Sequence, residues 1–357
     1  MAAGEGHACT VQALIESGAD PNQSDHEGWS PLHEAARQNR PDVLKVLLDA
    51  GVDPSTTREL NRTRWRPFLS SEGEPTALRI ACYRNRREAV EVLLSKVVQD
   101  ETQHALIWAA QDCTSDTVEL IINQPGVDVN FLLSGSTALH HACRRRDLRM
   151  VGALLNSGAD VEKCIEEDQC KDMRGSASSL GLTALQGLCL PHTATDYRLS
   201  SSARIFDLLV DAGADVHRRN VRKKTYLHQV VEADLKDSLL IATKLLQADV
   251  AVDAKDDTGN AALHYCRSDN MLQLLVDVGK ADLNARNRLD ETLFSRAVYE
   301  GQHNPALKLL KMGANSQMNC DGGSLHLVLH QLPDRVAGSC NLNHGAESDG
   351  AKVCIIS

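Results

Sequence analysis

Histidine and cysteine, which can bind metals or take part in catalysis, recur in short apolar segments of this chain. At most of these positions they belong to a repeated pattern such as PLHEAA or TALHHAC. A fixed place in a repeat indicates packing, because a free cysteine there behaves as a small hydrophobe. The sequence therefore predicts structural side chains, and no cofactor, at His33, His140, His141, Cys143, His228, His264, Cys266 and His326.

One cysteine pair is spaced differently. Cys164 and Cys170 bracket an acidic loop as C-x5-C, whereas a zinc site usually needs four ligands at close spacing. No second pair lies near them in the sequence, so we expect no metal site. The chain also contains no nucleophile–base constellation, no phosphate-binding loop and no HExxH motif. We therefore predict that the protein is not an enzyme.

Arginine gathers at one place in several units of the pattern, at the end of the first of two expected helices. In one interpretation these cations complement the carboxyl end of the helix dipole. In the other they form a positive ridge that binds an acidic segment of a partner. The residues concerned are Arg37, Arg40, Arg84, Arg86, Arg87, Arg144, Arg145 and Arg146.

An aromatic and basic motif, RTRWRPF, lies in a polar insertion. Trp65, Arg66 and Phe68 include the residue types that most often anchor protein interfaces. We predict that they contact a partner. The alternative is that the loop folds back and Trp65 covers an edge of a repeat.

Pairs of helices must position all of these residues. In the stretch 28–53, Ser30 and Pro31 predict a helix start. Gly51 predicts the end of a second helix. In a preceding copy Gly18 lies 33 residues before Gly51. One such unit cannot bury its own apolar faces, so it requires neighbours on which to stack.

This 33-residue period, with PLHEAA, TALHHAC and GADPN, resembles the ankyrin repeat. The resemblance implies an all-α ankyrin-repeat solenoid of roughly nine to ten helix-turn-helix units with hairpin tips. In the family's consensus pattern the histidine after the key leucine implies a hydrogen bond between repeats. We expect the array over 1–333 and a flexible tail, ending in CIIS, over 334–357. Insertions are expected near 55–74, 162–180 and 191–200.

By the same resemblance, the expected function is protein–protein recognition on a concave surface made of tips and first helices. Such a scaffold or adaptor loses little ordering entropy on binding, because its tips are already ordered. Besides the loop of Trp65, the candidate contacts are Asp25, His26, Glu27, Trp29 and Glu34. The partner is a protein whose identity the sequence does not determine.

The amino-acid composition agrees with a fold built of thin, stacked layers of paired helices. The 357 residues are 42% hydrophobic but only 3% aromatic, fewer rings than a single large core would use. A net charge of −10 argues against nucleic acid as a partner, because nucleic-acid binding requires a basic surface. The sequence shows neither an apolar run of membrane-spanning length nor a secretory signal. We therefore expect a cytoplasmic protein with reduced cysteines, with the nucleus as an open alternative.

The last four residues, from Cys354 to Ser357, fit the Cys-aliphatic-aliphatic-X box that directs prenylation. A terminal serine suggests a farnesyl group. One lipid gives only marginal membrane binding without a second signal, and only Lys352 is basic nearby. A prenyl-anchored membrane adaptor is therefore an alternative function, and membrane contact is expected only if Cys354 is modified.

A third function is substrate recognition within a cullin-type ubiquitin ligase. The stretch GWSPLHEAA is similar to units of the ankyrin-and-SOCS-box adaptors, which carry a box of the Ser/Thr-Leu-x-x-x-Cys type before a Leu-Pro pair. Here Ser324-Leu325 is followed by Leu329 instead of cysteine, and Leu332-Pro333 comes too early. Cys189 has the right spacing from Leu185, but it lies inside a repeat helix. No SOCS box is recognisable.

Overall fold

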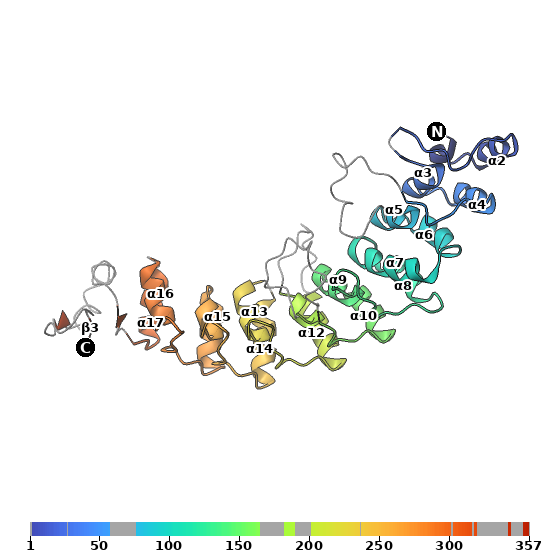
Figure 1. Ribbon diagram of the computed structural model, residues 1–357. Coiled ribbons are helices and arrows are strands. Elements are labelled where there is room, and N and C mark those ends of the chain that lie inside the picture. The colour runs from blue at the N-terminus through green and yellow to red at the C-terminus, as the bar shows by residue number, and fades with distance from the viewer. Residues whose placement is uncertain are drawn as a thin grey trace. The chain divides into compact units, whose positions relative to one another are not determined.

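The computed structural model describes residues 2–26, 28–57, 76–164, 182–189, 201–235, 237–300, 303–315, 318–319, 342–343 and 353–356. The chain forms two compact units, Met1–Asp215 and Val216–Ser357, called unit 1 and unit 2 below. In each unit the described residues form pairs of helices joined by short turns (Figure 1). The predicted all-α helix-turn-helix array is therefore confirmed, with nine helix pairs among the described residues.

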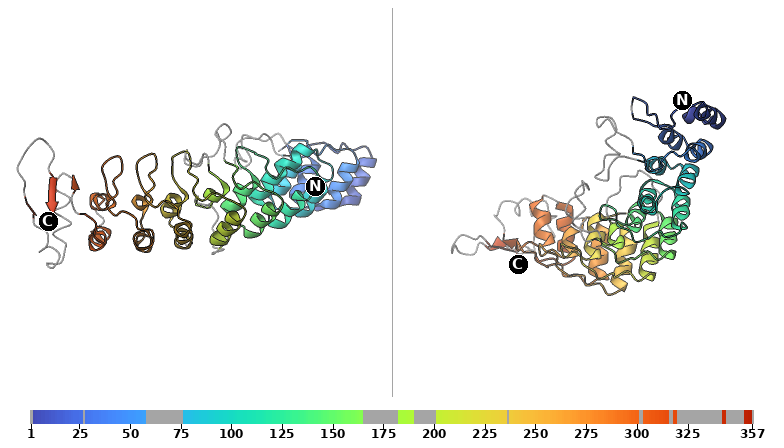
Figure 2. Two further views of the ribbon diagram at one scale, coloured as in Figure 1. Left: turned by 90° about the horizontal axis from the view of Figure 1, so that it is seen from below. Right: turned by 45° about the vertical axis from the view of Figure 1, so that its right-hand side comes forward.

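Six of these pairs belong to unit 1. Each first helix contacts the next first helix, and each second helix contacts the next second helix (Figures 1 and 2). The pairs are α1 (Ala2–Glu5) with α2 (Ala8–Glu16), α3 (Pro31–Arg37) with α4 (Pro41–Asp49), α5 (Ala77–Tyr83) with α6 (Arg87–Leu94), α7 (Gln99–Asp112) with α8 (Ser115–Ile122), α9 (Ala138–Arg145) with α10 (Leu148–Asn156), and α11 (Ala184–Gly187) with α12 (Ser201–Asp211).

The α3/α4 pair forms as its sequence predicts. The Ser30 side chain accepts a hydrogen bond from the backbone N–H of His33, and Pro31 follows as the first residue of α3. After α4, Gly51 has a φ of 85°, a backbone conformation that glycine adopts without strain. Leu32 and Leu44 are fully buried, and burial of each such side chain stabilises the fold by about 1.5–3 kcal/mol.

Unit 2 contains three described helix pairs and three short strands. The pairs are α13 (Tyr226–Ala233) with α14 (Ser238–Gln247), the 3-10 turn η4 (Ala262–Tyr265) with α15 (Asp269–Asp277), and α16 (Leu293–Tyr299) with α17 (His303–Lys311). Strand β3 (Val353–Ile356) pairs antiparallel with β1 (Met318–Asn319) and β2 (Leu342–Asn343). The first helix of the η4/α15 pair is reduced to one 3-10 turn because this repeat is shorter between its helices.

The fourth helix pair departs from the expected pattern. The sequence pattern places its first helix from Ala105, but α7 already begins at Gln99. Residues 99–104 contain neither glycine nor proline. The acidic residues Asp100 and Glu101 lie in the first turn, where negative charge suits a helix start. Only residues 95–98 connect α6 to α7, so helix occupies the place of a hairpin tip.

The histidines that follow the key leucines make the predicted hydrogen bonds between repeats. The Nε2 atoms of His33, His140 and His228 donate to the carbonyl oxygens of Thr56 (3.1 Å), Leu182 (3.2 Å) and Asn260 (3.1 Å). His264 donates likewise to Glu291 over 3.3 Å. In His140 the Nδ1 atom accepts from the backbone N–H of Thr137, so the neutral tautomer with a proton on Nε2 satisfies both bonds.

Several predicted features lie wholly or mostly outside the described residues. These are the half repeat near Ser324, His326, and the three insertions apart from the edges at 55–57 and 162–164. The expected boundary between array and tail at 333/334 also falls there, and of the tail only β2 and β3 are described. The extents of the array and of the tail stay predictions. None of the described helices is both long and apolar enough to span a membrane.

Candidate interaction surface

Three clusters, each with one cation, one aromatic ring and one carboxylate, lie where tips meet first helices. Two belong to unit 1 and one to unit 2. We call them the Trp29 cluster (Trp29, Glu34, Arg37), the Trp108 cluster (Arg79, Glu101, Trp108) and the Tyr265 cluster (Lys224, Glu232, Tyr265).

In the Trp29 cluster the charges pair. The guanidinium of Arg37 donates to both carboxylate oxygens of Glu34, over 2.6 and 2.8 Å, and its Cζ lies 5.5 Å from the centroid of the Trp29 ring. Burial disfavours the charged form of Glu34, but hydrogen bonds from Arg37 and Gln38 outweigh it and lower the pKa of this carboxyl. The cluster lines a groove of about 730 Å³ between α1, α2 and α3.

The other residues predicted at this tip are divided between structure and surface. The carboxylate of Asp25 accepts a hydrogen bond from the backbone N–H of Trp29 over 2.8 Å, so Asp25 closes the tip that presents the ring. His26 is exposed and Trp29 is half-buried. Glu27 lies outside the described residues. The structure thus brings Asp25, Trp29 and Glu34 to the wall of one groove.

Four of the eight arginines at the ends of first helices donate to a carbonyl of a neighbouring repeat. Arg40 donates to Gly4 (3.0 Å), Arg86 to Arg37 (3.1 Å) and Arg145 to Ala110 (3.1 Å). Arg146 donates to Leu188 over 3.4 Å. These acceptors lie at the carboxyl ends of first helices or just beyond them, which supports the interpretation of helix-end stabilisation.

The remaining basic candidates differ in exposure. Arg84 and Arg87 are exposed, with Arg84 5.9 Å from the ring of Tyr83. Arg144 is half-buried beside His141, and its burial lowers the pKa of its guanidinium. A positive ridge available to a partner is therefore reduced mainly to Arg84 and Arg87.

The side chains of four further candidates lie outside the described part of the chain. Trp65, Arg66 and Phe68 lie outside the described residues. The backbone of Cys354 belongs to β3, where it is paired with Met318. Partner binding by the insertion and lipidation of Cys354 stay predictions.

The Trp108 cluster was not predicted from the sequence. The ring of His104 stacks on Trp108 with centroids 5.7 Å apart, and the Cζ of Arg79 lies 5.1 Å from the Trp108 centroid. Glu101 is only 8% exposed. Its Oε2 accepts from the Ser55 hydroxyl over 3.1 Å, whereas its buried Oε1 has no hydrogen-bond partner. The cluster lines a groove of about 420 Å³.

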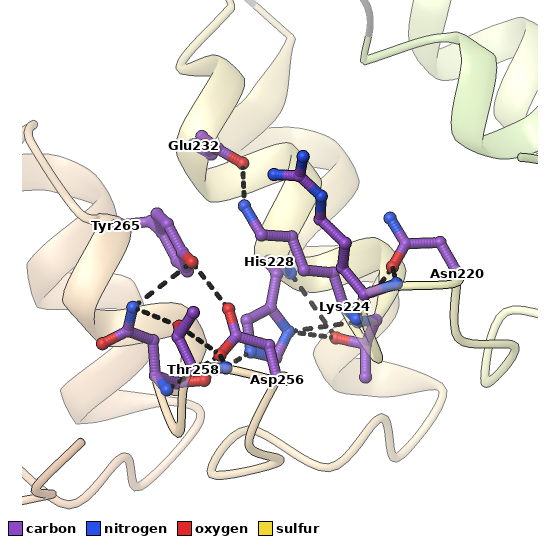
Figure 3. Close-up of polar contacts among 10 residues, drawn as sticks. Asn220, Lys224, His228, Glu232, Asp256, Thr258 and Tyr265 are labelled. Atoms are coloured by element: carbon purple, nitrogen blue, oxygen red, sulfur yellow. Dashed lines mark hydrogen bonds and ion pairs between the residues drawn. The ribbon is translucent and has the colours of Figure 1, made fainter. Parts of the chain in front are cut away.

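The Tyr265 cluster was also missed, and here the cation, Lys224, forms an ion pair with the carboxylate, Glu232 (Figure 3). The Nζ of Lys224 donates to Glu232 over 2.6 Å and lies 4.0 Å from the Tyr265 centroid. The Tyr265 hydroxyl donates to Asp256 over 2.6 Å. Burial disfavours the charged form of Asp256, but hydrogen bonds from Tyr265, Thr258 and Asn260 outweigh it and lower the pKa of this carboxyl.

Only weak sequence signals could have revealed these two clusters. The lack of turn residues over 99–104 predicts a helix in place of a tip, and thereby a buried first turn containing Glu101. For Lys224 and Tyr265 no local signal exists, because their contact joins two different repeats. Within the described residues no group of three or more His, Cys, Asp or Glu side chains could hold a metal ion. Cys170, which was weighed as a ligand, lies outside them.

The family models for ankyrin repeats support this architecture. Residues 1–58, 59–132 and 78–165 match the family model for ankyrin repeats in three copies, and residues 258–288 match the model for the single ankyrin repeat. The ankyrin repeat domain of human ASB11 superimposes with a TM-score of 0.45 and 22% identity, over 63% of this chain and 88% of that structure.

Two curated relatives also match. The human transient receptor potential cation channel subfamily A member 1 is 26% identical over 71% of this chain and 24% of its own length. The mouse B-cell lymphoma 3 protein homolog is 32% identical over 42% of this chain and 33% of its own length. The chain spans about a quarter to a third of these relatives. With more than half of its residues matched by the two ankyrin models, the chain belongs to the ankyrin-repeat family.

Proposed function

We propose that this chain is an adaptor that binds a protein partner on the tips and first helices of unit 1. The ankyrin repeats support a role in protein–protein interaction, and their fold is generally a non-catalytic interaction domain. The observation that carries the proposal is the groove of about 730 Å³ at the Trp29 cluster.

The groove has the properties of a recognition site. Trp29 is a half-buried ring of the kind that anchors interfaces. The Arg37 side chain extends from α3 over this ring and donates two hydrogen bonds to Glu34. The tip and the helix are already ordered, so little conformational entropy is lost there when a partner binds. Pro21 and Leu14 add apolar surface to the same groove.

Proximity labelling in cells tests this proposal. We would compare the full chain with a double variant on the groove, Trp29→Ala with Arg37→Ala. The matched control is Asp42→Ala with Lys45→Ala, which removes an exposed ion pair of 3.6 Å on α4. The groove variant should lose a set of labelled proteins that the control retains. Identical sets from all three proteins would contradict binding at this groove.

The same experiment separates the two alternative functions. A Cys354→Ser variant that loses membrane-associated proteins from its set would favour the prenyl-anchored adaptor. Elongin B/C and a cullin in the set of the full chain would favour the ligase substrate receptor. Soluble partners unaffected by Cys354→Ser, without elongins or cullin, fit the adaptor proposed here.

A further inference from the structure

The groove of the Trp108 cluster exists because one tip is absent. Thr57 and Thr76 pair at the base of one tip, and Leu133 and Ser136 pair in another. Between the two, where a tip would follow α6, only residues 95–98 and the first turns of α7 are found. The groove of about 420 Å³ is lined by Thr57 and Thr76 together with Leu133, and by the early residues of α7.

Glu101 gives this groove a buried carboxyl oxygen without a hydrogen-bond partner. The side chain is more than nine-tenths buried, and Oε1 lacks any hydrogen-bond donor. A buried acceptor without a partner is destabilising, and more so when it is charged. Among the residues that the structure describes, no lysine, arginine or histidine forms an ion pair with Glu101.

In the other two clusters a basic side chain pairs with the carboxylate. Glu34 receives two hydrogen bonds from Arg37, and Glu232 receives one from Lys224 over 2.6 Å. In the Trp108 cluster the nearby cation, Arg79, lies over the indole ring and forms no ion pair with Glu101. Among the residues that the structure describes, no side chain therefore pairs with Glu101 as Arg37 and Lys224 pair with the carboxylates of the other clusters.

The charge of the groove favours a cation. The acidic and basic residues that line it are Arg79, Asp100 and Glu101, two acidic side chains against one basic side chain. A metal ion such as Ca²⁺ would need six to eight oxygen ligands, more than one buried and one exposed carboxylate offer. A guanidinium suits the site better, because it is planar, packs against rings and binds a carboxylate through two parallel hydrogen bonds.

We propose that the groove at Glu101 binds a cationic side chain, preferably an arginine, of the protein partner. The proposal rests on the adaptor function proposed above and names the chemistry of its partner. The last torsion of a glutamate side chain is broad, so a small rotation turns Oε1 towards the groove. The Oε2 atom keeps its hydrogen bond to Ser55 or exchanges it for the second bond to the guanidinium.

Nuclear magnetic resonance of the indole groups tests the proposal directly. The chain contains three tryptophans, so Trp29→Phe and Trp65→Phe assign the Trp108 indole N–H signal by elimination. The probe is the tripeptide acetyl-Gly-Arg-Gly-amide, and its neutral isostere carries citrulline in place of arginine. In the full chain we expect the arginine peptide to shift the Trp108 signal saturably and the citrulline peptide to leave it unchanged.

Two variants locate the effect. Glu101→Gln keeps the shape of the side chain and removes its charge, and should weaken binding of the arginine peptide at least 10-fold. Asp100→Asn removes an exposed charge from the same groove and should weaken binding less than 3-fold. Equal binding by Glu101→Gln and the unaltered chain, equal losses in both variants, a shift by the citrulline peptide, or no shift by arginine would each overturn the proposal.

The outcome is independent of the adaptor test. If the groove variant Trp29→Ala with Arg37→Ala keeps all its labelled proteins while the arginine peptide still titrates Trp108, recognition at the Trp29 groove fails and the chemistry at Glu101 stands. If labelling depends on the Trp29 groove but no arginine binds at Glu101, the adaptor function stands and the cation site fails. The citrulline comparison uses the unaltered chain, so it does not depend on the folding of any variant.

Discussion

The Trp108 cluster and the Tyr265 cluster contain the same three kinds of side chain, yet their charges are arranged differently. In the Tyr265 cluster, Lys224 contacts both the ring and Glu232. In the Trp108 cluster, Arg79 contacts the ring while Glu101 keeps one oxygen without a donor. A cluster with its charges matched stabilises its own repeats, whereas an unmatched buried carboxylate is a cost that a binding partner can remove.

The neighbourhoods of the two clusters differ in the same way. Around Tyr265 the tips are linked to one another, since the Asp257 N–H donates to the Arg222 carbonyl and the Arg288 N–H to the Thr258 carbonyl. Around Trp108 a tip is missing, and a groove takes its place. We infer that continuous tips favour internal pairing of charges and that an interrupted row of tips leaves a carboxylate for an external ligand.

The largest effect is expected when the network of the Tyr265 cluster is broken at Asp256. The Asp256 carboxylate accepts from the backbone N–H groups of Thr258 and Asn260, each over 2.9 Å, and from the Tyr265 hydroxyl. Asp256→Ala should destabilise unit 2 by about 3 kcal/mol, because several donors at this partly buried site lose their acceptor together. Hydrogen exchange of peptides within 216–300 measures this loss.

The neighbouring aspartate provides the control for that variant. The structure gives Asp257 only a backbone hydrogen bond, so Asp257→Ala should change the free energy of opening by less than about 0.5 kcal/mol. Similar protection in Asp256→Ala and Asp257→Ala would show that the carboxylate of Asp256 does not hold the tip.

A smaller loss is expected from Lys224→Met, which keeps the apolar stem and removes the charge. The variant loses the ion pair with the half-exposed Glu232 and the contact of the ammonium with the Tyr265 ring. We expect unit 2 to lose about 1–2 kcal/mol, measured by the same exchange experiment. Lys223→Met, at an exposed neighbouring position, should be close to neutral, and an equal loss there would contradict the role of Lys224.

The Trp108 cluster should respond in the opposite direction. Glu101→Gln removes an unmatched buried charge, so we expect unit 1 to gain about 1 kcal/mol. For a unit of this size that gain corresponds to a rise in Tm of about 2–4 °C, measurable by scanning calorimetry. Asp100→Asn serves as the control with little change. A fall in Tm for Glu101→Gln would mean that the carboxylate already has a stabilising partner in the free protein.

The smallest effect that we predict is a pH dependence at the Tyr265 cluster. Burial lowers the pKa of His228, although the Asn260 carbonyl and the charge of Asp256 oppose the shift. Since the unfolded chain then binds the proton more readily, this histidine stabilises unit 2 fully above its ordinary pKa of 6.5. That contribution is lost as the pH falls from there through the lowered value.

Calorimetry at pH 7.5 and 5.5 checks this direction. The unaltered chain should lose more stability between the two values than His228→Gln does. If the variant has the same pH dependence as the unaltered chain, His228 is not the group responsible.

Much of the fold could be predicted because its signals are local. Ser30 and Pro31 specify the start of α3, Gly51 the end of α4, and the apolar spacing the buried faces. The hydrogen bonds of His33 and His140 followed from the family pattern. The sites were predicted less well, since four of the eight arginines of the predicted binding ridge donate to carbonyls of neighbouring repeats. The sequence does not indicate whether such an arginine donates to a carbonyl of its own chain or to an acidic group of a partner.

By itself, the sequence determined the repeat period, the helix pairs and the positions reserved for small and histidine side chains, because caps, glycines and apolar spacing act within a few residues. Only the tertiary structure decided which charges meet. Lys224 reaches the ring of Tyr265 from the preceding repeat, and Glu101 lines a groove that two separate tips flank. Such contacts depend on how repeats stack, since Coulomb energy and burial vary over a few ångströms that no local pattern encodes.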